Sequence, residues 1–299
     1  MIKTKFEDII DVSKIGRTDV PVLSGELFRM AESEDINQKG EETLLLAIDM
    51  QNSFMEKGSL GVPGSHGDVE RLCRFIYSNT DRISDIMLSL DAHDPMQIFH
   101  PIWWKDDSGN VPKPFTVITA NDMKSGKWNS VVSFEDSLNY VENLERLGKK
   151  QLTIWPYHCI KGTIGQSLEC MFSNLIYFFS TARRIFITTV LKGEDPFSEM
   201  YGIFKPEYSK IGFVNVKLLK SIEKYQKIFI AGEASSHCVL ESVKQITEFY
   251  GEDNRITSRV HILTDCMSPI PGFESGTELE FLALAEKYGI RLVKSTDAF

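Results

Sequence analysis

The sequence predicts a three-layer α/β fold with a parallel central sheet. Short apolar runs of strand length alternate along the chain with segments of helical periodicity, and the runs at 43–48 and 228–231 contain no polar alternation. Strands of this kind are buried on both faces, as in parallel sheets whose crossover helices cover both sides. The connections between such strands are right-handed, which places one sheet between two helical layers.

The composition favours a protein that acts on small molecules. The 299 residues carry a formal net charge of −9, and no stripe of lysine or arginine offsets it, so we expect neither nucleic acid nor an anionic membrane as a partner. No apolar run reaches the length of a membrane span, and the N-terminus lacks a signal-peptide core. The five cysteines are widely spaced without a CxxC pair, which argues against a disulfide framework and for a reducing, cytoplasmic location.

The chain begins with a polar, mixed segment over residues 1–40, which we interpret as an N-terminal extension that packs on the main domain or stays partly mobile. The main domain is predicted over 41–299. Its first strand, 43–48, ends in Asp49, and the carboxyl edge of a parallel sheet is where α/β folds place their ligands. Apolar residues then recur on one face of a helix expected from about 68 to 79.

The second strand, around 83–90, leads into candidate metal ligands. It ends in Asp91-Ala92-His93, and alternate side chains of a strand point to the same side, so Asp91 and His93 can reach one ion. His100 follows seven residues later, and His158 is a third candidate from a later loop. An Asp-x-His pair alone is a weak signal, because such motifs often occur by chance.

A long segment then separates the second strand from the third. We interpret residues from about 105 to 150 as an insertion over the sheet edge, with a short strand in PKPFTVI and a helix at 135–147. A helix is expected from about 166 to 180, followed by a third core strand at 184–191 that ends in Lys192. The oligomeric state is left open, and a homo-oligomer is compatible with the sequence.

Cys238 occupies a position suited to a nucleophile. The strand 228–231 is broken by Gly232, and Cys238 stands where a helical pattern begins. The unpaired N–H groups at a helix start lower the pKa of a thiol, and N–H groups near Ala234 and Cys238 can hold the oxyanion that forms when a thiolate attacks a carbonyl carbon. The alternative is a small cysteine packed behind a helix, as most free cysteines are.

Three chemically complementary side chains end strands at one edge of the predicted sheet. Asp49 can accept the thiol proton of Cys238 and later pass it to a leaving amine, while Lys192 favours the thiolate by its charge. An acid, an ammonium and a thiol at one edge predict amide hydrolysis through a thioester. We expect His237, beside the cysteine, to have a structural role, because catalytic roles are assigned by geometry and not by proximity in sequence.

The chain resembles the nicotinamidase-related cysteine hydrolases of the isochorismatase-like superfamily. The resemblance rests on five separated motifs that occur in the order of that family: AIDMQNSF with GSLGVPG, DAHDP, WPYHCIKGT, LKG followed by MYGIF, and GEASSHC. It covers about residues 44–292 and implies a Rossmann-like sheet, a cis peptide bond before Ala234 and a catalytic triad of Asp49, Lys192 and Cys238.

The same resemblance implies a cofactor, a pocket and a reaction. One divalent metal ion, Zn, Fe or Mn, would be held by Asp91, His93 and His158, with His100 as a candidate further ligand. Phe54 and Trp155 would flank the substrate ring, and we expect Tyr201 in the pocket wall. The leading reaction is hydrolysis of nicotinamide to nicotinate and ammonia, a step of NAD metabolism.

Several positions depart from the family pattern and leave alternatives open. Ala92 stands where tryptophan is usual, Ser236 where aspartate is usual, and Glu233 where an apolar residue is common. Glu233, Ala92 and the long insertion motivate a second reading, a metal-containing cysteine hydrolase of another amide, ureido or carbamoyl compound. A third reading, a non-catalytic relative used for binding, is disfavoured because Asp49, Lys192 and Cys238 are all present.

Overall fold

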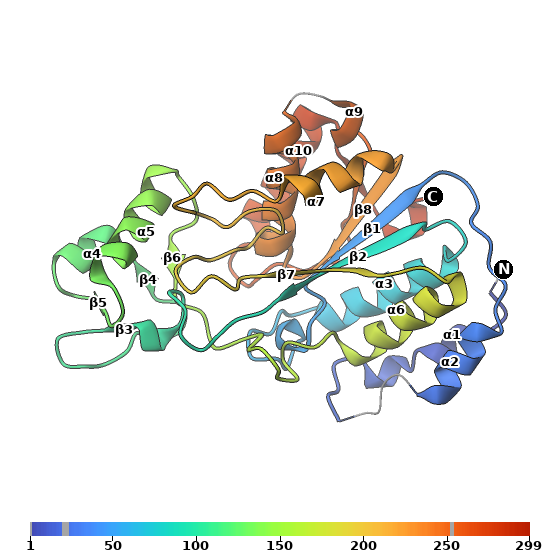
Figure 1. Ribbon diagram of the computed structural model, residues 1–299, viewed down its shortest axis with the longest axis horizontal. Coiled ribbons are helices and arrows are strands. Elements are labelled where there is room, and N and C mark those ends of the chain that lie inside the picture. The colour runs from blue at the N-terminus through green and yellow to red at the C-terminus, as the bar shows by residue number, and fades with distance from the viewer. Residues whose placement is uncertain (1, 20–23, 252–253) are drawn as a thin grey trace.

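A six-stranded parallel sheet forms the centre of the molecule (Figure 1). The computed structural model describes residues 2–19, 24–251 and 254–299. The strand order is β10-β9-β8-β1-β2-β7, and every neighbouring pair is parallel. The predicted fold class is therefore confirmed. The strands are β1 (Thr43–Ile48), β2 (Asp85–Asp91), β7 (Thr188–Lys192), β8 (Lys227–Gly232), β9 (Val260–Leu263) and β10 (Arg291–Val293).

Helices cover both faces of the sheet (Figure 1). The helices on one face are α3 (Ser65–Ser78) and α6 (Cys170–Arg183); those on the other are α7 (Val216–Ser221), α8 (Leu240–Tyr250) and α10 (Glu274–Tyr288), and the short α9 (Asn254–Thr257) precedes β9. The apolar run of β1 supplies both cores, because Leu45 packs in the cluster of α3 and α6 while Leu44 and Leu46 pack in the cluster of α8.

The N-terminal segment packs on the outer side of α6. Its helices are α1 (Phe6–Ile9) and α2 (Gly25–Glu32) (Figure 1). Phe6, Ile9 and Leu27 are buried in the same apolar cluster as the α6 side chains. We expected this segment either to pack on the main domain or to stay partly mobile, and its described part packs on the main body. Its status as an extension and the boundary at residue 41 stay predictions.

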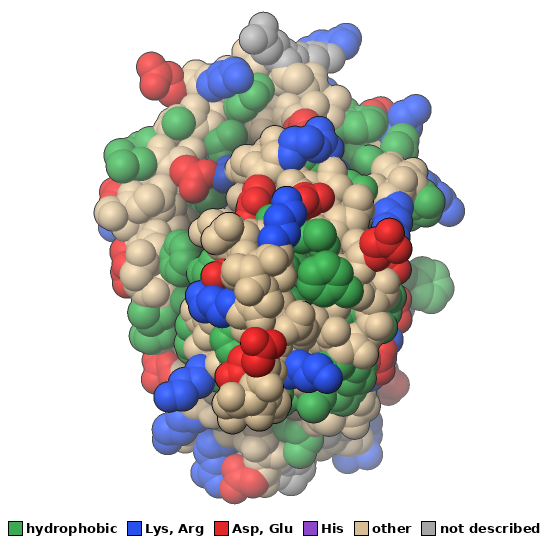
Figure 2. All heavy atoms as spheres, turned by 90° about the vertical axis from the view of Figure 1, so that its left-hand side faces the viewer, with side chains coloured by type: hydrophobic (Ala, Val, Ile, Leu, Met, Phe, Trp, Pro, Cys, Tyr) green, Lys and Arg blue, Asp and Glu red, His purple; other side chains and the backbone are tan. Residues whose placement is uncertain are grey.

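The segment from about 105 to 150 forms a lobe at one end of the molecule (Figure 1). The elements of this segment and of the residues beside it are β3 (Trp104–Lys105), β4 (Val117–Ile118), α4 (Ala120–Lys124), β5 (Asn129–Ser130), α5 (Phe134–Arg146) and β6 (Leu152–Thr153). β3 pairs with β5 and β4 with β6, both antiparallel. Figure 2 shows acidic, basic and apolar side chains interspersed on the face that this end presents, so neither sign of charge dominates there.

The structure corrects two expected boundaries. The run 184–191 was expected as a core strand, but β7 begins only at Thr188, forms the edge of the sheet, and is preceded by Phe186, which is 95% exposed. An apolar run of strand length does not reveal which strand lies at an edge. The helix expected from about 166 begins instead at Cys170, because the Glu169 side chain accepts a hydrogen bond from the Phe172 N–H and caps the helix.

The strand order places the chemistry. Connections run outward from β1 through β2 to β7, and outward from β8 through β9 to β10, so the direction of winding reverses between β1 and β8. Ligands of doubly wound sheets bind at the carboxyl ends of the strands beside such a reversal. Asp49 follows β1 and Cys238 follows β8. Among the helices described, none has the length and apolarity of a membrane span.

Candidate active site

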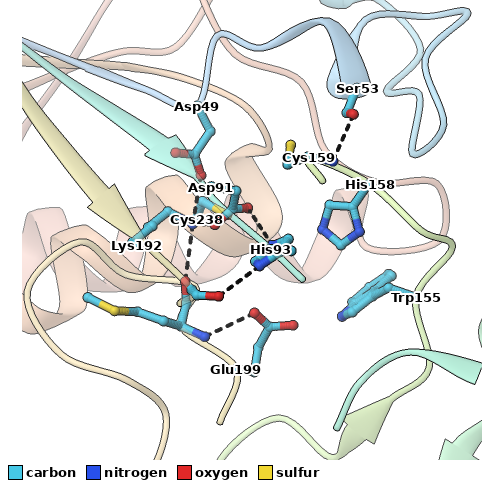
Figure 3. A network of polar contacts seen from close by, with 12 residues as sticks. Asp49, Ser53, Asp91, His93, Trp155, His158, Cys159, Lys192, Glu199 and Cys238 are labelled. Carbon is cyan, nitrogen blue, oxygen red and sulfur yellow. Dashed lines mark hydrogen bonds and ion pairs between the residues drawn. The ribbon is translucent and has the colours of Figure 1, made fainter. Parts of the chain in front are cut away.

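A buried ammonium group links three of the predicted site residues (Figure 3). Lys192 ends β7, and its Nζ lies 2.8 Å from Asp49 Oδ2 and 2.5 Å from Asp91 Oδ1. The same nitrogen lies 3.6 Å from Cys238 Sγ and donates to the Met200 carbonyl at 3.1 Å. The carboxyl ends of β8, β1 and β7 therefore bring Asp49, Lys192 and Cys238 together at one edge of the sheet, as the sequence predicted.

The two carboxylates around Lys192 differ in their affinity for a proton. Burial alone would lower the pKa of Lys192, but Asp49 and Asp91 raise that pKa well above its usual value, so the group stays an ammonium. Burial would also raise the pKa of Asp91, yet Lys192 and His93 hold it below its usual range. For Asp49 burial prevails and raises the pKa. Asp49 is thus the carboxyl group poised to accept a proton.

The thiol of Cys238 behaves differently from the expectation. The helix start was expected to lower its pKa, but burial raises the pKa of Cys238 well above its usual value, and Lys192 only partly opposes this effect. The side chain is buried, with 5% of its surface exposed, and the carboxylates of Asp49 and Asp91 approach the sulfur, all three ligand atoms lying within 4.8 Å of one another. The resting thiol is therefore neutral, and attack requires a base beside it.

The backbone after β8 forms the wall behind the thiol. Gly232 has a φ of 125°, and a Cβ there would collide with the Ile48 carbonyl group, so only glycine fits this approach of β8 to β1. The Glu233–Ala234 peptide bond is cis, as the resemblance implied. A π-helical turn, Ser235–Val239, then carries Cys238 into α8, and both Ala234 and Cys238 line the cavity.

Three imidazole rings meet beside this charged cluster. Ligand atoms of Asp91, His93 and His158 lie within 4.8 Å of one another. The Nδ1 atom of His93 lies 3.0 Å from the Gly193 carbonyl oxygen, and that of His158 lies 2.8 Å from the Pro156 carbonyl oxygen. A carbonyl only accepts hydrogen bonds, so each Nδ1 carries a hydrogen, and Nε2 is the nitrogen of each ring that can face a metal ion.

The electrostatics of the rings suit a cation. Burial, with the neighbouring His93, lowers the pKa of His158 to about 3 and that of His100 to about 4, so both rings are neutral. The buried Nε2 atoms of His93 and His100 have no hydrogen-bond partner in the described structure. Burial alone would lower the pKa of His93, but Asp91 raises it above its usual value, so a metal ion would replace a proton at His93 Nε2. The neutral His158, His93 Nε2 and Asp91 therefore form a donor set that fits a divalent metal. The His100 ring centroid lies 6.1 Å from that of His93, outside the three-residue cluster, and its role as a ligand stays a prediction.

A small cavity opens onto Cys238 between these two clusters. The three predicted substrate contacts, Phe54, Trp155 and Tyr201, all line it, and Trp155 Nε1 donates to Tyr201 Oη at 3.1 Å. The full lining is Phe54, Leu60, Asp91, Trp155, His158, Glu199, Tyr201, Ala234, His237, Cys238 and Ile270. The cavity thus joins aromatic walls, the thiol and the imidazoles in one space.

Sequence reasoning missed Glu199, which lies in this cavity (Figure 3). Burial raises its pKa to about 7, with Asp91 adding to the rise and His93 opposing it, and its Oε1 accepts a hydrogen bond from the Met200 N–H at 2.9 Å. The only signal in the sequence is its place in EMYGIF, two residues before the predicted contact Tyr201.

Two further residues hold the acids and were also missed. Ser89 Oγ donates to Asp49 Oδ1 at 2.6 Å. Gln51 makes a paired contact with the backbone of Asp91: its Nε2 donates to the carbonyl at 2.9 Å, and its Oε1 accepts from the N–H at 2.8 Å. Both residues bridge β1 and β2, a pairing that only the folded sheet creates.

A wider groove lies on the other side of the Lys192 backbone, between β7 and the lobe. Tyr140, Leu191 and Phe213 are among its lining residues, and neither Cys238 nor a histidine borders it. We therefore assign the chemistry to the smaller cavity.

Comparison with known proteins gives agreement in structure alone. No family model matches the sequence, and no curated protein matches it in sequence. The structure is similar to yeast nicotinamidase Pnc1p bound to the inhibitor nicotinaldehyde, with 20% identity and a TM-score of 0.58, covering 84% of this chain and 99% of that one. It is similar to an Acinetobacter baumanii nicotinamidase/pyrazinamidase, with 16% identity and a TM-score of 0.60, covering 87% and 99%.

A third similar structure is pyrazinamidase of Pyrococcus horikoshii in complex with zinc, with 17% identity and a TM-score of 0.50, covering 85% of this chain and 99% of that one. Likeness at this level of identity establishes architecture, whereas activity depends on the residues of the site. The chain therefore has the isochorismatase-like fold of the nicotinamidases and pyrazinamidases.

Proposed function

We propose that this protein is a cysteine amidohydrolase that hydrolyses a small carboxamide through a thioester on Cys238, with nicotinamide as the leading substrate. The observation that carries the proposal is the buried contact of Lys192 with Asp49 and Cys238 at the mouth of a cavity walled by aromatic side chains. The names of the similar structures, nicotinamidase and pyrazinamidase, support the same class of substrate.

The first half of the reaction forms the thioester. Asp49 takes the proton of the neutral Cys238 thiol as the sulfur attacks the amide carbon, and the carbonyl electron pair moves to the oxygen. The N–H groups of Ala234 and Cys238 are proposed to hold that oxyanion. Asp49 then returns the proton to the amide nitrogen, the C–N bond breaks, and ammonia leaves. Lys192 keeps its charge throughout and stabilises the developing thiolate.

The second half releases the acid. Asp49 takes a proton from water as the water oxygen attacks the thioester carbon, and a second oxyanion forms in the same place. The C–S bond breaks, the sulfur recovers its proton from Asp49, and the carboxylic acid leaves. The balance is one amide and one water converted to one acid and one ammonia.

Asp91, His93 and His158 would hold one divalent metal ion, Zn, Fe or Mn. Such an ion supplies a Lewis acid that can bind an electron pair of the substrate, such as a ring nitrogen, and so fix the orientation of the amide toward Cys238. The free Nε2 atom of His93 and the neutral state of His158 support this proposal.

A second candidate is hydrolysis of another amide, ureido or carbamoyl compound. Glu199 places a carboxyl group with a pKa of about 7 in the cavity, where it could accept a hydrogen bond from an additional N–H group of a substrate. A non-catalytic binding role is less well supported. Burial of Lys192 with two carboxylates costs desolvation energy, and binding alone does not require these buried charges.

Ammonia release from nicotinamide tests the proposal, with Cys238→Ala as the key variant. We expect the substitution to lower turnover by about a thousandfold or more, because no other nucleophile replaces the sulfur. Cys73→Ala is the matched control: this thiol is equally buried but lies on α3, under the opposite face of the sheet, so its loss should cost stability and leave turnover within about threefold.

Residual activity of Cys238→Ala above about a hundredth of the wild-type rate would exclude Cys238 as the nucleophile. A wild-type protein that ignores nicotinamide but releases ammonia from a ureido or carbamoyl compound would favour the second candidate.

Metal content is measured on the same samples, with His93→Ala as the second variant. We expect this variant to lose the ion and to raise KM more than it lowers kcat, because the ion is proposed to orient the substrate while Asp49, Lys192 and Cys238 remain. Unchanged metal content by elemental analysis would refute the ligand assignment.

A further inference from the structure

A second pair of acids lies buried directly beside the proposed oxyanion loop. Glu233, 0% exposed, precedes Ala234, and Asp68 of α3 is 1% exposed. Asp68 accepts from Arg71 Nη2 at 2.8 Å on one oxygen and from Ser268 Oγ at 2.5 Å on the other. Glu233 Oε2 accepts from the Ser268 N–H at 3.4 Å, whereas its Oε1 receives no hydrogen bond within the described chain.

The carboxyl groups of Glu233 and Asp68 lie close enough to share a hydrogen bond. Two carboxylates in contact away from water do not both ionise, so one of them keeps a proton. Asp68 has Arg71 and a hydroxyl donor, while Glu233 has no cation of its own; the proton therefore belongs on Glu233, which donates it to Asp68. Burial, followed by the charge of Asp68, raises the pKa of Glu233 well above its usual value, in agreement with this assignment.

The pair is connected to both sides of Ala234. The Glu233 N–H donates to the Ile48 carbonyl at 2.9 Å, and the Ser235 N–H donates to the Ser268 carbonyl at 2.9 Å. Ser268 is the same residue that donates to both acids. Displacement of Glu233 from Asp68 would therefore move the backbone on which the Ala234 N–H is carried.

We propose that one proton shared between Glu233 and Asp68 holds the segment 233–235 in place, and that loss of this proton at alkaline pH releases it. Glu233 acts as a positioning residue, since it reaches the reaction only through Ala234; the catalytic consequence rests on the proposed function of that N–H group.

Two other titratable groups lie beside the Glu233–Asp68 pair. Arg71 of α3 is partly exposed and pairs with Asp68, and Cys266 of the loop after β9 lies near Asp68 and Arg71. Burial raises the pKa of Cys266 far above its usual value, so that thiol stays neutral across the range in which the acid pair is tested. The proton of Glu233 is then the only one of this group whose loss adds a buried negative charge.

The sign of the pH dependence follows from the raised pKa of Glu233. A folded pKa above the unfolded value stabilises the protonated form, so the contribution is complete below the unfolded pKa and is lost as the pH rises through the folded pKa. Glu233→Gln replaces the proton by an amide that donates to Asp68 and still accepts from Ser268, at every pH. The variant should therefore keep this stabilisation at alkaline pH, where the wild type loses it.

The experiment compares wild type, Glu233→Gln and Glu169→Gln from about pH 6 to about pH 9. Glu169 is the matched control, a 0% exposed glutamate whose pKa burial also raises, but which caps α6 on the other side of the sheet. Two readouts are taken: kcat for amide hydrolysis, and hydrogen exchange of the peptide spanning 233–240, compared between proteins at the same pH.

We expect the ratio of the exchange rate at 233–240 in wild type to that in Glu233→Gln to rise about tenfold from the acidic to the alkaline end of the pH range. The kcat of wild type should fall over the same range. Glu169→Gln should follow the wild type. Asp68→Asn provides a second test if Glu233→Gln does not fold, because an asparagine there donates to Glu233 Oε1 and removes the need for a shared proton, so this variant too should lose the alkaline change.

The same pH dependence of exchange in wild type, Glu233→Gln and Asp68→Asn would overturn the proposal. A folded Glu233→Gln whose segment 233–240 exchanges faster than that of the wild type at all pH values would also overturn it. The exchange readout needs no substrate. A protein that hydrolyses no amide but shows the expected exchange difference would therefore refute the proposed function while the positioning role of Glu233 stands.

Discussion

Asp49 derives its basicity from its place at the end of β1. It adopts a φ of 49°, in the left-handed region that few residues other than glycine enter, which turns its carboxylate toward Lys192. Ser89 fixes that carboxylate from the neighbouring strand, with its Oγ donating to Oδ1 while Lys192 faces Oδ2. One oxygen is thus held, and the other is directed toward the ammonium and the thiol.

Removal of the Ser89 hydroxyl tests this orientation. We expect Ser89→Ala to lower kcat about tenfold or more with little change in KM, because the carboxylate loses its anchor while the substrate cavity is untouched. The unpaired oxygen should also cost about 1–3 kcal/mol of stability. Steady-state kinetics and urea unfolding measure the two effects.

Ser65→Ala serves as the control, since Ser65 Oγ is equally buried, lies on α3 and has no hydrogen-bond partner in the described structure. Equal kinetic losses in the two variants would contradict an orienting role for Ser89.

At the scale of the element, the end of β7 must approach the histidines closely. Gly193, with a φ of 72°, follows Lys192, and its carbonyl accepts from His93 Nδ1 at 3.0 Å. A Cβ at this position would overlap the His93 ring and lie 3.3 Å from Asp91 Oδ1. The turn after β7 therefore positions the proposed catalytic ammonium and a metal-ligand candidate together, which requires glycine.

Gly193→Ala should displace His93 and lower both metal content and kcat/KM, the latter about tenfold or more. Gly212→Ala isolates this effect from backbone strain, because Gly212 has a similar φ of 64° but nothing within 4 Å of a Cβ. Both variants should lose about 1 kcal/mol of stability from the left-handed conformation. A fully metallated, active Gly193→Ala would exclude the close contact as a requirement.

For the whole molecule, buried histidines make the folded state sensitive to acid. His100, His158 and His237 have pKa values lowered to about 4, 3 and 3, in each case first by burial. In the unfolded chain they bind protons below about pH 6.5, so stability is complete above that pH and falls as the pH drops toward the folded values. Burial lowers the pKa of His93, but Asp91 raises it by more. His93 is therefore charged in both the folded and the unfolded state below that pH and adds no slope to the pH dependence of stability there.

The three rings should therefore destabilise metal-free protein on acidification, by up to about 1.4 kcal/mol per pH unit each. The buried carboxyl groups of Glu199 and Glu207, whose pKa values are raised to about 7 and about 8, oppose this change, because they bind protons in the folded state over the same range. Urea unfolding of wild type and His237→Gln at about pH 7, 6 and 5 in the presence of a chelator isolates one ring, and we expect the variant to lose up to about 1.4 kcal/mol less per pH unit than wild type. Identical slopes for the two proteins would contradict the buried, neutral state of His237.

Much of the fold and part of the site follow from local patterns. The apolar run 43–48 and the acid after it predict a buried parallel strand and a site residue, because strand burial and the position of the carboxyl edge are properties that a short segment expresses by itself. The same reasoning placed Asp91, His93 and Lys192 at the ends of their strands. It placed β7 in the core, however, because an exposed edge and a buried centre have the same apolar pattern.

The sequence alone thus determined the sheet, its parallel direction and the identity of the acid, ammonium and thiol, since each depends on residues close together in the chain. Tertiary structure alone decided the charge states: Cys238 is neutral because the whole core encloses it, although a helix start by itself favours the thiolate. It also decided the supporting contacts of Ser89, Glu199 and the Glu233–Asp68 pair, because these join residues from 40 to 165 positions apart, and no local pattern encodes which strands become neighbours.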